Sequence, residues 1–411
     1  MIRPLRRNRS LAGLLLLLLA LPVLYGQKSA EQPDSYLAGR AAMLGENYPV
    51  AISCLEQSLQ EQPGQENVLL NLGISRFRLG KFQAAQLAFY ELEQRKSGMG
   101  SIWLARTELH LKHPDLAMKY LRKHLASPYR LDESVILLDE DLQSLEGSSR
   151  WKQLWEENDW YSHDDEEFKE ALYLEKHGQE LEALNKLNAL EKKGYKPSLV
   201  LTRKAGIYSE LGNQKAARSA LQEAVKKDVR NLEARHFLAE ILVEDEKFEE
   251  ARKELDILIR REPDRFEAYL LRARARSASG NLQGARSDLD SYLLYFPGRH
   301  DVLYRKGLIE HEHGKYLNAI ASFNSALGMS SGEADYYLAR GQSYMATGTT
   351  VYAEKDLSMA LDLDPLNPKA WFSMGQVAEK LGKKQKACDC YGRAQQLGLY
   401  EAGNHVERLC R

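Results

Sequence analysis

The sequence predicts an all-α protein built from stacked helix pairs, and three regularities along the chain indicate this fold class. Through the second half of the chain an alanine recurs every 34 residues. A small residue stands twelve positions before each of these alanines, and a bulky apolar residue stands four positions after it. Most units also carry a glycine between the two predicted helices. A single helix pair cannot bury its own apolar stripe, so units with this pattern stack on one another.

Each recurring position has a role in holding two antiparallel helices together. Small residues let the two backbones approach closely, and the bulky residue fills the space beside them. Glycine adopts the positive φ that ends the first helix, and proline stops the second helix in several units. The small, alanine and bulky positions are, in order, Ala171, Ala183 and Leu187; Ala205, Ala217 and Leu221; Ala239, Ala251 and Leu255; Ala273, Ala285 and Leu289; Gly307, Ala319 and Phe323; Gly341, Ala353 and Leu357; and Gly375, Ala387 and Tyr391.

Three further units precede these seven, the third of them weaker, so the pattern extends over most of the chain. Their small, alanine and bulky positions are Gly39, Ala51 and Leu55; Gly73, Ala85 and Phe89; and Ala105, Ala117 and Leu121. The pattern resembles the tetratricopeptide repeat (TPR) family. The resemblance implies a right-handed α-solenoid of about ten helix-turn-helix repeats, three in residues 27–131 and seven in residues 164–401, with a capping helix at 402–411. It also implies a concave groove that holds peptides or partner proteins, and it implies no reaction.

Residues 132–163 fill one repeat length without the repeat pattern, and we interpret them as a degenerate unit that joins the two sub-arrays. Residues 132–167 contain thirteen acidic side chains against two basic ones. Trp151 and Trp155 lie four residues apart and therefore share one helix face. Together with Trp160 they form either an exposed acidic and aromatic surface for a partner or a plug that fills a discontinuity in the stack.

The N-terminal residues 1–26 have the composition of a secretory signal peptide. A start rich in arginine is followed by an apolar run from Leu11 to Leu24. This run is shorter than the roughly twenty apolar residues that span a membrane. We expect cleavage between Gly26 and Gln27 and export to the periplasm or cell envelope of a Gram-negative cell. The alternative is an uncleaved N-terminal anchor, and otherwise we expect membrane contact only through envelope proteins.

Composition and motifs exclude several classes of function. The chain has 411 residues, of which 44 % are apolar and 28 % charged, and this balance suits a folded protein. A net charge of −1 provides no basic field for nucleic acid. No phosphate-binding loop, dinucleotide-binding glycine motif or nucleophile elbow is present, and His311 and His313 lie on different sides of a helix instead of forming a metal site. We therefore expect no enzymatic activity, no cofactor and no bound metal.

The resemblance also implies which residues contact a partner. In this family the first helix of each unit lines the concave side, at repeat positions 2, 5, 9 and 12. The lysine and asparagine pair that clamps the C-terminal carboxylates of chaperones is absent from positions 5 and 9 of every unit. We expect instead a mixed apolar and polar groove for an extended segment or an amphipathic helix, and the alternative for any single side chain is that it faces water. The candidate groove residues are His236, Glu240, Leu270, Arg274, Tyr304, Leu308, His311, Leu338, Gln342, Met345, Phe372 and Gln376.

Three of the four cysteines lie close to the C-terminus. In the second helix of the last unit, Cys388 leans toward the buried face of Tyr391, whereas Cys390 is expected to point outward. Secreted bacterial TPR proteins that end in a cysteine-bearing cap resemble this chain. A Cys388–Cys410 disulfide would attach the capping helix, and such bonds persist outside the cytosol; the alternative is three unpaired thiols. Cys54 is expected to be a core thiol.

These observations together predict a non-catalytic scaffold of the cell envelope that binds a segment of a partner protein in its groove. The alternative function is that of a chaperone-like holder of unfolded exported proteins, which would bind many chains weakly. An enzyme would need a catalytic cluster spread over several units, and the sequence indicates none.

Overall fold

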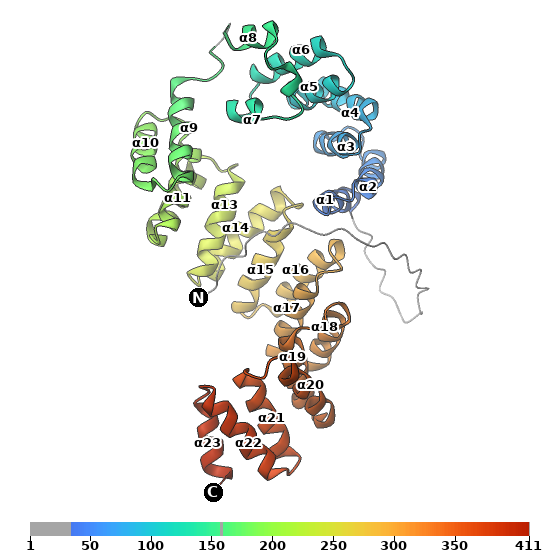
Figure 1. Ribbon diagram of the computed structural model, residues 1–411, viewed down its shortest axis with the longest axis vertical. Helices are drawn as coiled ribbons and strands as arrows, with labels where there is room; N and C mark the ends of the chain where they lie inside the picture. The colour runs from blue at the N-terminus through green and yellow to red at the C-terminus, as the bar shows by residue number, and fades with distance from the viewer. Residues whose placement is uncertain (1–33, 157–158, 411) are drawn as a thin grey trace. The chain divides into compact units, whose positions relative to one another are not determined.

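The computed structural model describes residues 34–156 and 159–410, and within these ranges every regular element is a helix (Figure 1). The fold class expected from the sequence, a solenoid of paired helices, is confirmed. The predicted signal peptide at residues 1–26 lies outside the described residues. None of the described helices combines the length and the apolar character of a membrane span.

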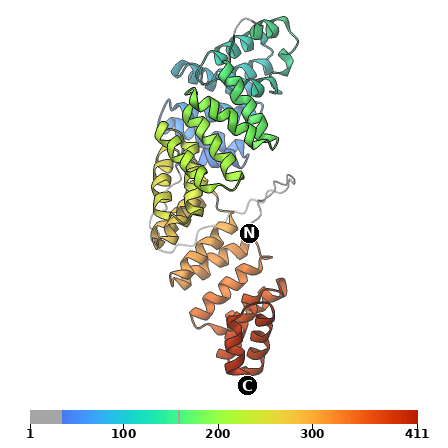
Figure 2. The same ribbon diagram turned by 90° about the vertical axis from the view of Figure 1, so that its left-hand side faces the viewer.

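Ten helix pairs, each joined by a tight turn, follow one another along the described chain (Figure 1). Figure 2 shows the same helices turned by 90°. The first three pairs are α1 (Ser35–Leu44) with α2 (Tyr48–Glu61), α3 (Glu66–Arg78) with α4 (Phe82–Arg95), and α5 (Ser101–His110) with α6 (Pro114–Leu125). An irregular segment follows, made of α7 (Glu133–Leu137), the 3-10 turn η1 (Gln143–Leu145) and α8 (Ser149–Glu156).

Seven further pairs and one final helix complete the described chain. The pairs are α9 (His163–Lys176) with α10 (Glu180–Lys192), α11 (Pro197–Glu210) with α12 (Gln214–Lys227), α13 (Leu232–Glu244) with α14 (Phe248–Arg261), α15 (Phe266–Ala278) with α16 (Leu282–Tyr295), α17 (His300–Glu312) with α18 (Tyr316–Met329), α19 (Ala334–Ala346) with α20 (Thr350–Leu363), and α21 (Pro368–Lys380) with α22 (Lys384–Gln396). The final helix is α23 (Glu401–Leu409), which packs against α22. From α1 to α6 and again from α9 to α23, each paired helix contacts its partner and the next helix along the chain, as stacked repeats do.

The two helices of a pair meet where the small residue of the first faces the bulky residue of the second. In two pairs the bulky residue is aromatic, and the small residue that faces it, Gly307 or Gly375, leaves room for the ring. A Cβ built on Gly375 would lie 2.6 Å from the Tyr391 ring, and one built on Gly307 would overlap the ring of Phe323. Both rings are fully buried. The backbones of these pairs therefore approach each other as closely as the missing side chain allows.

Replacing Gly307 with alanine tests this contact. The added methyl group would have to displace the buried Phe323 ring, and overpacking of this kind costs about 1–3 kcal/mol. We therefore expect Gly307→Ala to lower the thermal unfolding midpoint measured by circular dichroism. Gly328→Ala in α18 is the matched control, because open space surrounds that glycine and alanine improves helix propensity by up to about 1 kcal/mol. An unchanged midpoint for Gly307→Ala would contradict the packing argument.

The turns inside the pairs need a residue with positive φ, and glycine usually provides it. Gly280, between α15 and α16, has a φ of 78°. At the equivalent place in other pairs, Glu46, Lys112 and Glu246 adopt φ values of 56°, 64° and 59°. An L-residue in this region costs roughly 1–2 kcal/mol. These three turns are therefore held in shape by the packing of the helices that they connect.

Ion pairs link the two helices of two pairs in the second part of the chain. Asp288 on α16 accepts hydrogen bonds from Arg272 and Arg276 on α15, at 2.6 and 2.9 Å, and is buried. Arg340 on α19 contacts Asp356 on α20 at 2.7 Å. In both pairs the arginine and the aspartate are sixteen residues apart, like the small and bulky positions. A buried charge without its partner is strongly unfavourable, so these contacts depend on both helices being in place.

The irregular segment packs its tryptophans inward. Trp151 is 8 % exposed and lies in one apolar cluster with Leu154, and Trp155 and Trp160 are partly buried against the same cluster. The indole N–H of Trp160 donates to the backbone carbonyl of Leu154 at 2.8 Å. These three tryptophans therefore do not form the exposed aromatic surface that was one of the two alternatives. They fill space where the repeat pattern is lost.

The first helix contacts a repeat far along the chain. The Arg40 guanidinium on α1 pairs with Asp264, in the turn before α15, at 2.7 Å, and the Tyr36 hydroxyl lies 3.4 Å from the same carboxylate. Burial, together with the Asp264 charge, raises the pKa of Tyr36 to about 12. Ala41 is buried in a cluster that also contains Phe266. The first unit is thus attached to its neighbour in sequence and to a distant unit.

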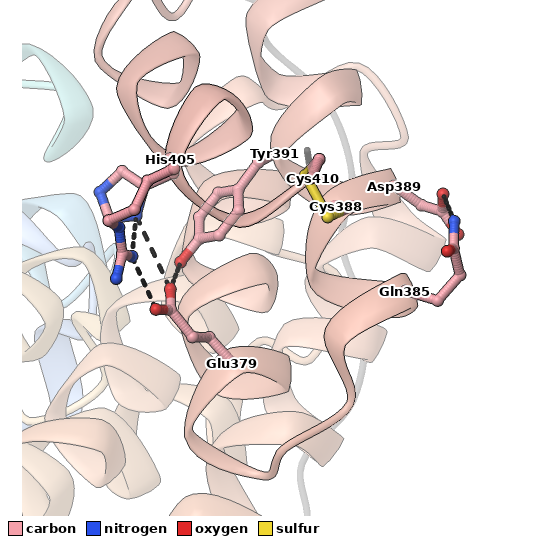
Figure 3. Close-up of a disulfide and its surroundings, with 8 residues drawn as sticks. Glu379, Gln385, Cys388, Asp389, Tyr391, His405 and Cys410 are labelled. Atoms are coloured by element: carbon pink, nitrogen blue, oxygen red, sulfur yellow. Dashed lines mark hydrogen bonds and ion pairs between the residues drawn. A yellow bond between two sulfur atoms is a disulfide. The ribbon is translucent and has the colours of Figure 1, made fainter.

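The final helix α23 covers the last pair through several contacts (Figure 3). The sulfur atoms of Cys388 and Cys410 lie at bonding distance, and the two Cα atoms are 5.6 Å apart. Glu379 on α21 accepts hydrogen bonds from the Tyr391 hydroxyl at 2.8 Å and from Arg408 on α23 at 2.6 Å. Partial burial raises the pKa of Glu379, but these two hydrogen bonds outweigh it and hold the pKa below its usual value.

Both remaining cysteines differ from their expected burial, because Cys390 is buried and Cys54, expected to be a core thiol, is only partly buried. Cys390 is 3 % exposed and belongs to the cluster that contains Met374 of α21, so the expectation that it points outward is wrong. It lies three residues after Ala387 and four before Ala394, and residues at these spacings share a helix face. Cys54 is partly buried, and burial raises the pKa of its thiol.

We expect Cys388 and Cys410 to be bonded in protein isolated under oxidising conditions. In the chain-entropy model a crosslink that closes a loop of this length stabilises the fold by roughly 3 kcal/mol. Reduction, or the paired change Cys388→Ser and Cys410→Ser, should therefore speed amide hydrogen exchange in α23, measured by mass spectrometry. Cys54→Ala is the control and should leave exchange in α23 unchanged. Alkylation of both thiols before any reduction would contradict the prediction.

Candidate partner-binding groove

All twelve predicted groove residues lie on the first helices of consecutive pairs. Glu240 and Arg274 are exposed, Leu338 is 7 % exposed, and the other nine are partly buried. The set comprises His236 and Glu240 on α13; Leu270 and Arg274 on α15; Tyr304, Leu308 and His311 on α17; Leu338, Gln342 and Met345 on α19; and Phe372 and Gln376 on α21.

Several side chains of this set already have partners in a neighbouring helix pair. The ring of Tyr304 stacks on that of Tyr336, with centroids 4.4 Å apart. The Nδ1 atom of His311 lies 2.8 Å from the hydroxyl of Ser343, and burial lowers the pKa of this histidine. Leu338 belongs to the apolar core between α19 and its neighbours and presents little surface to a partner. These side chains therefore serve partly or wholly in the stacking of the repeats.

Two adjacent hollows open on the first-helix face of α13, α15 and α17. The first has a volume of 310 Å³ and lies between α15 and α17, and the second has a volume of 330 Å³ and lies between α13 and α15. Arg274 lines both of them. The first hollow is lined by Leu270, Ala273, Arg274, Ser277, Ala278, Leu289, Arg305, Leu308, Ile309 and Glu312. The second hollow is lined by Ser209, Phe237, Glu240, Ile241, Glu244, Leu271 and Arg274.

The two hollows differ in charge. Partial desolvation raises the pKa of Glu240, although about half of its side chain stays exposed, and the neighbouring Glu244 raises the pKa further. Burial, together with the charge of Arg265, lowers the pKa of His236, whose Nδ1 atom lies 3.2 Å from the Arg265 guanidinium. The His236 imidazole beside the second hollow is therefore neutral at pH 7, and the carboxylates make this hollow acidic. The first hollow is mainly apolar and has arginines at its opening.

Sequence reasoning missed residues that line the hollows one helical turn beyond the predicted positions. Glu244 follows Glu240 by four residues, and Glu312 follows Leu308 by four. Residues four apart share a helix face, so extending the predicted positions by one turn would have found them. Leu289 of α16 also lines the first hollow, and a rule that considers only first helices cannot identify it.

The groove residues suit binding by surface contact. In the described part of the chain, no group of three or more histidine, cysteine, aspartate or glutamate side chains is arranged as a metal site. The side chains around both hollows are apolar, hydroxyl-bearing or singly charged. Such side chains bind a partner by apolar packing, hydrogen bonds and ion pairs.

Comparison with known families gives the class of the protein. Three models of the tetratricopeptide repeat match the chain, one at residues 208–276, one at residues 36–100 and 270–334, and one at residues 368–397. The chain belongs to the tetratricopeptide repeat family. Proteins of this family generally bind protein partners and are typically non-catalytic.

Individual relatives match only parts of the chain. It is 35 % identical over 72 residues to "Tetratricopeptide repeat protein 16" of Mus musculus, which is 18 % of this chain and 9 % of that protein. It is 30 % identical over 111 residues to "Translocon at the outer membrane of chloroplasts 64" of Pisum sativum, which is 26 % of this chain and 19 % of that protein. The chain thus spans less than a fifth of either relative. A crystal structure of the C-terminal part of a TPR repeat-containing protein from Cytophaga hutchinsonii is 19 % identical, with a TM-score of 0.48, and covers 56 % of this chain and 95 % of that one.

The raised pKa of Glu240 predicts that its ionised carboxylate lowers the stability of the folded protein at neutral pH. Because the folded state holds this proton more tightly than the unfolded state, stability from this group falls as pH rises through the folded pKa. Because the half-exposed side chain is screened by water, we expect Glu240→Gln to raise the thermal midpoint only slightly at pH 7 and to have little effect near pH 4. Glu233→Gln, in the first turn of the same helix, is the control and should not raise the midpoint. A lower midpoint for Glu240→Gln at pH 7 would show that the carboxylate is stabilising.

Proposed function

We propose that this protein is a non-catalytic scaffold that binds a segment of a partner protein along the first helices of its C-terminal repeats. The observation that carries the proposal is the pair of adjacent hollows over α13, α15 and α17, which share Arg274. Three consecutive repeats contribute to this surface, so it has the length to contact several residues of an extended or helical segment.

Packing inside the repeats supports the same function. The helices that carry the hollows are held by buried contacts such as Asp288 with Arg272 and Arg276. A surface held in this way needs little ordering when a partner binds, and less free energy is lost on association. A rigid surface with mixed apolar and charged side chains favours a defined partner over a broad set of unfolded chains.

We also propose that the protein is exported and acts in the periplasm or cell envelope. The basic and apolar composition of residues 1–26 supports export. The proximity of Cys388 and Cys410 supports it further, because disulfides persist in oxidising compartments. Alkylation of these two cysteines in intact cells tests this proposal, since both thiols would stay free in the cytosol.

A photo-reactive amino acid placed in the groove tests the scaffold function in cells that make the protein. We expect p-benzoyl-phenylalanine at Gln342 or Gln376, on α19 and α21, to capture one or two defined proteins identified by mass spectrometry. The same residue at Lys355 or Asp362, both exposed on the second helix α20, is the matched control and should capture none.

The pattern of capture decides between the alternatives. Many unrelated chains bound at the groove positions would favour a chaperone-like holder of exported proteins. Equal capture at the groove and control positions, or no capture in the groove, would contradict the proposed function.

A further inference from the structure

Most arginines and lysines between Phe266 and Glu312, from α15 to α17, form ion pairs inside the protein. Arg272 and Arg276 pair with Asp256 and Asp288, Arg286 and Lys306 pair with Asp290, and Arg299 pairs with Asp301. Among the arginines and lysines of residues 266–312, all of which the structure describes, only Arg274 and Arg305 make no close ion pair, and the charge of Arg305 acts on Asp301 without direct contact. Both are exposed, and both line the first hollow. The two arginines without an ion pair therefore both line the first hollow.

The first hollow exists because α15 carries small side chains where the neighbouring first helices carry larger ones. Ser277 and Ala278 line it near the end of α15. The residues 34 positions before and after them are Val243 and Glu244 on α13 and His311 and Glu312 on α17. Leucine and isoleucine side chains from α15, α16 and α17 line the rest. The hollow is therefore an apolar depression with space for one bulky side chain.

We propose that this hollow binds an acidic segment of a partner protein, which inserts one bulky apolar side chain between α15 and α17 and places carboxylates beside Arg274 and Arg305. The inference rests on the proposed function and names the class of segment that the groove recognises. Guanidinium groups bind carboxylates through paired, charge-assisted hydrogen bonds. Glu312 is the single acidic side chain that lines the hollow, so the two arginines leave its net charge positive.

The second hollow limits where the acidic residues of such a segment lie. Glu240 and Glu244 line it beyond Arg274 and repel carboxylates. Acidic residues are therefore favoured only around the inserted apolar residue, and neutral or basic residues are favoured where the segment continues toward α13. Because the arginines stand at an exposed opening, their contribution falls as salt concentration rises.

Three fluorescein-labelled synthetic peptides test the inference on the full chain. The first has a central leucine with two glutamates on each side, the second has lysines in place of the glutamates, and the third has glycine in place of the leucine. Fluorescence anisotropy at low ionic strength should show that the first peptide binds at least about tenfold more tightly than the other two. The double change Arg274→Glu and Arg305→Glu should weaken its binding about tenfold, and Ala278→Trp, which fills the hollow, should have a similar effect.

Two matched variants control for general effects of charge and bulk. Arg260→Glu reverses an exposed arginine on the second helix α14, and Ala321→Trp adds a ring at an exposed position of α18. Both should bind the first peptide as the unaltered protein does, and circular dichroism should give the same helix content for every variant. Equal binding of the lysine peptide, unchanged binding by the double arginine variant, or no binding of any peptide would overturn the inference.

Photo-crosslinking at Gln376 separates the failure of this inference from the failure of the proposed function. Capture of a defined partner at Gln376, with no preference for the acidic peptide, would overturn only the acidic specificity. Absence of capture at every groove position would overturn the scaffold function itself. Capture at Gln376 that the double change Arg274→Glu and Arg305→Glu abolishes would support both.

Discussion

The close contact between the two helices of each pair is the constraint on which the structure depends. A small residue on the first helix gives the bulky residue of the second a place to pack, as Gly307 does for Phe323. This contact sets the distance and tilt of the two helices, and the next pair packs on the result. The first helices of consecutive pairs therefore follow one another in order, and this order places the two hollows side by side over α13, α15 and α17.

Most of the fold was predictable from the sequence because every repeat solves the same packing problem with the same residue types. The 34-residue period identified all ten helix pairs. It did not predict the short helices of residues 132–163, where tryptophans replace the repeat pattern. The twelve predicted groove residues lie on first helices, as the repeat frame implied, but Leu338 is buried because a position rule fixes the helix face and not the depth of packing. Cys390 was likewise expected to point outward and is buried, because helix spacing alone did not fix which side of α22 packs against α21.

The 34-residue period does not predict contacts between repeats that are distant in the chain. A repeat pattern encodes how a unit packs on its neighbours, and the pairing of Arg40 with Asp264 joins units that are far apart in the chain. Neither residue occupies a recurring position of the pattern. The contact adds a non-local link to an array whose other contacts are mostly local. It therefore restrains the first unit from two sides, which its own repeat contacts alone would not do.

The residues that depart from the repeat pattern give this chain its distinctive surface chemistry, because the recurring positions are used for packing. Arg272 and Asp288 recur two repeats later as Arg340 and Asp356, so this ion pair is made within two of the units, whereas the unit between them has Lys306 and Ser322 at the same positions. Arg274 makes no ion pair with any described residue, although Glu240, Glu244 and Glu312 line the same two hollows. The missing bulk on α15 and the unpaired guanidinium groups occur at the same hollow. A partner that supplies an apolar side chain and a carboxylate satisfies both deficits at once, whereas neither water nor a neighbouring repeat satisfies the two together.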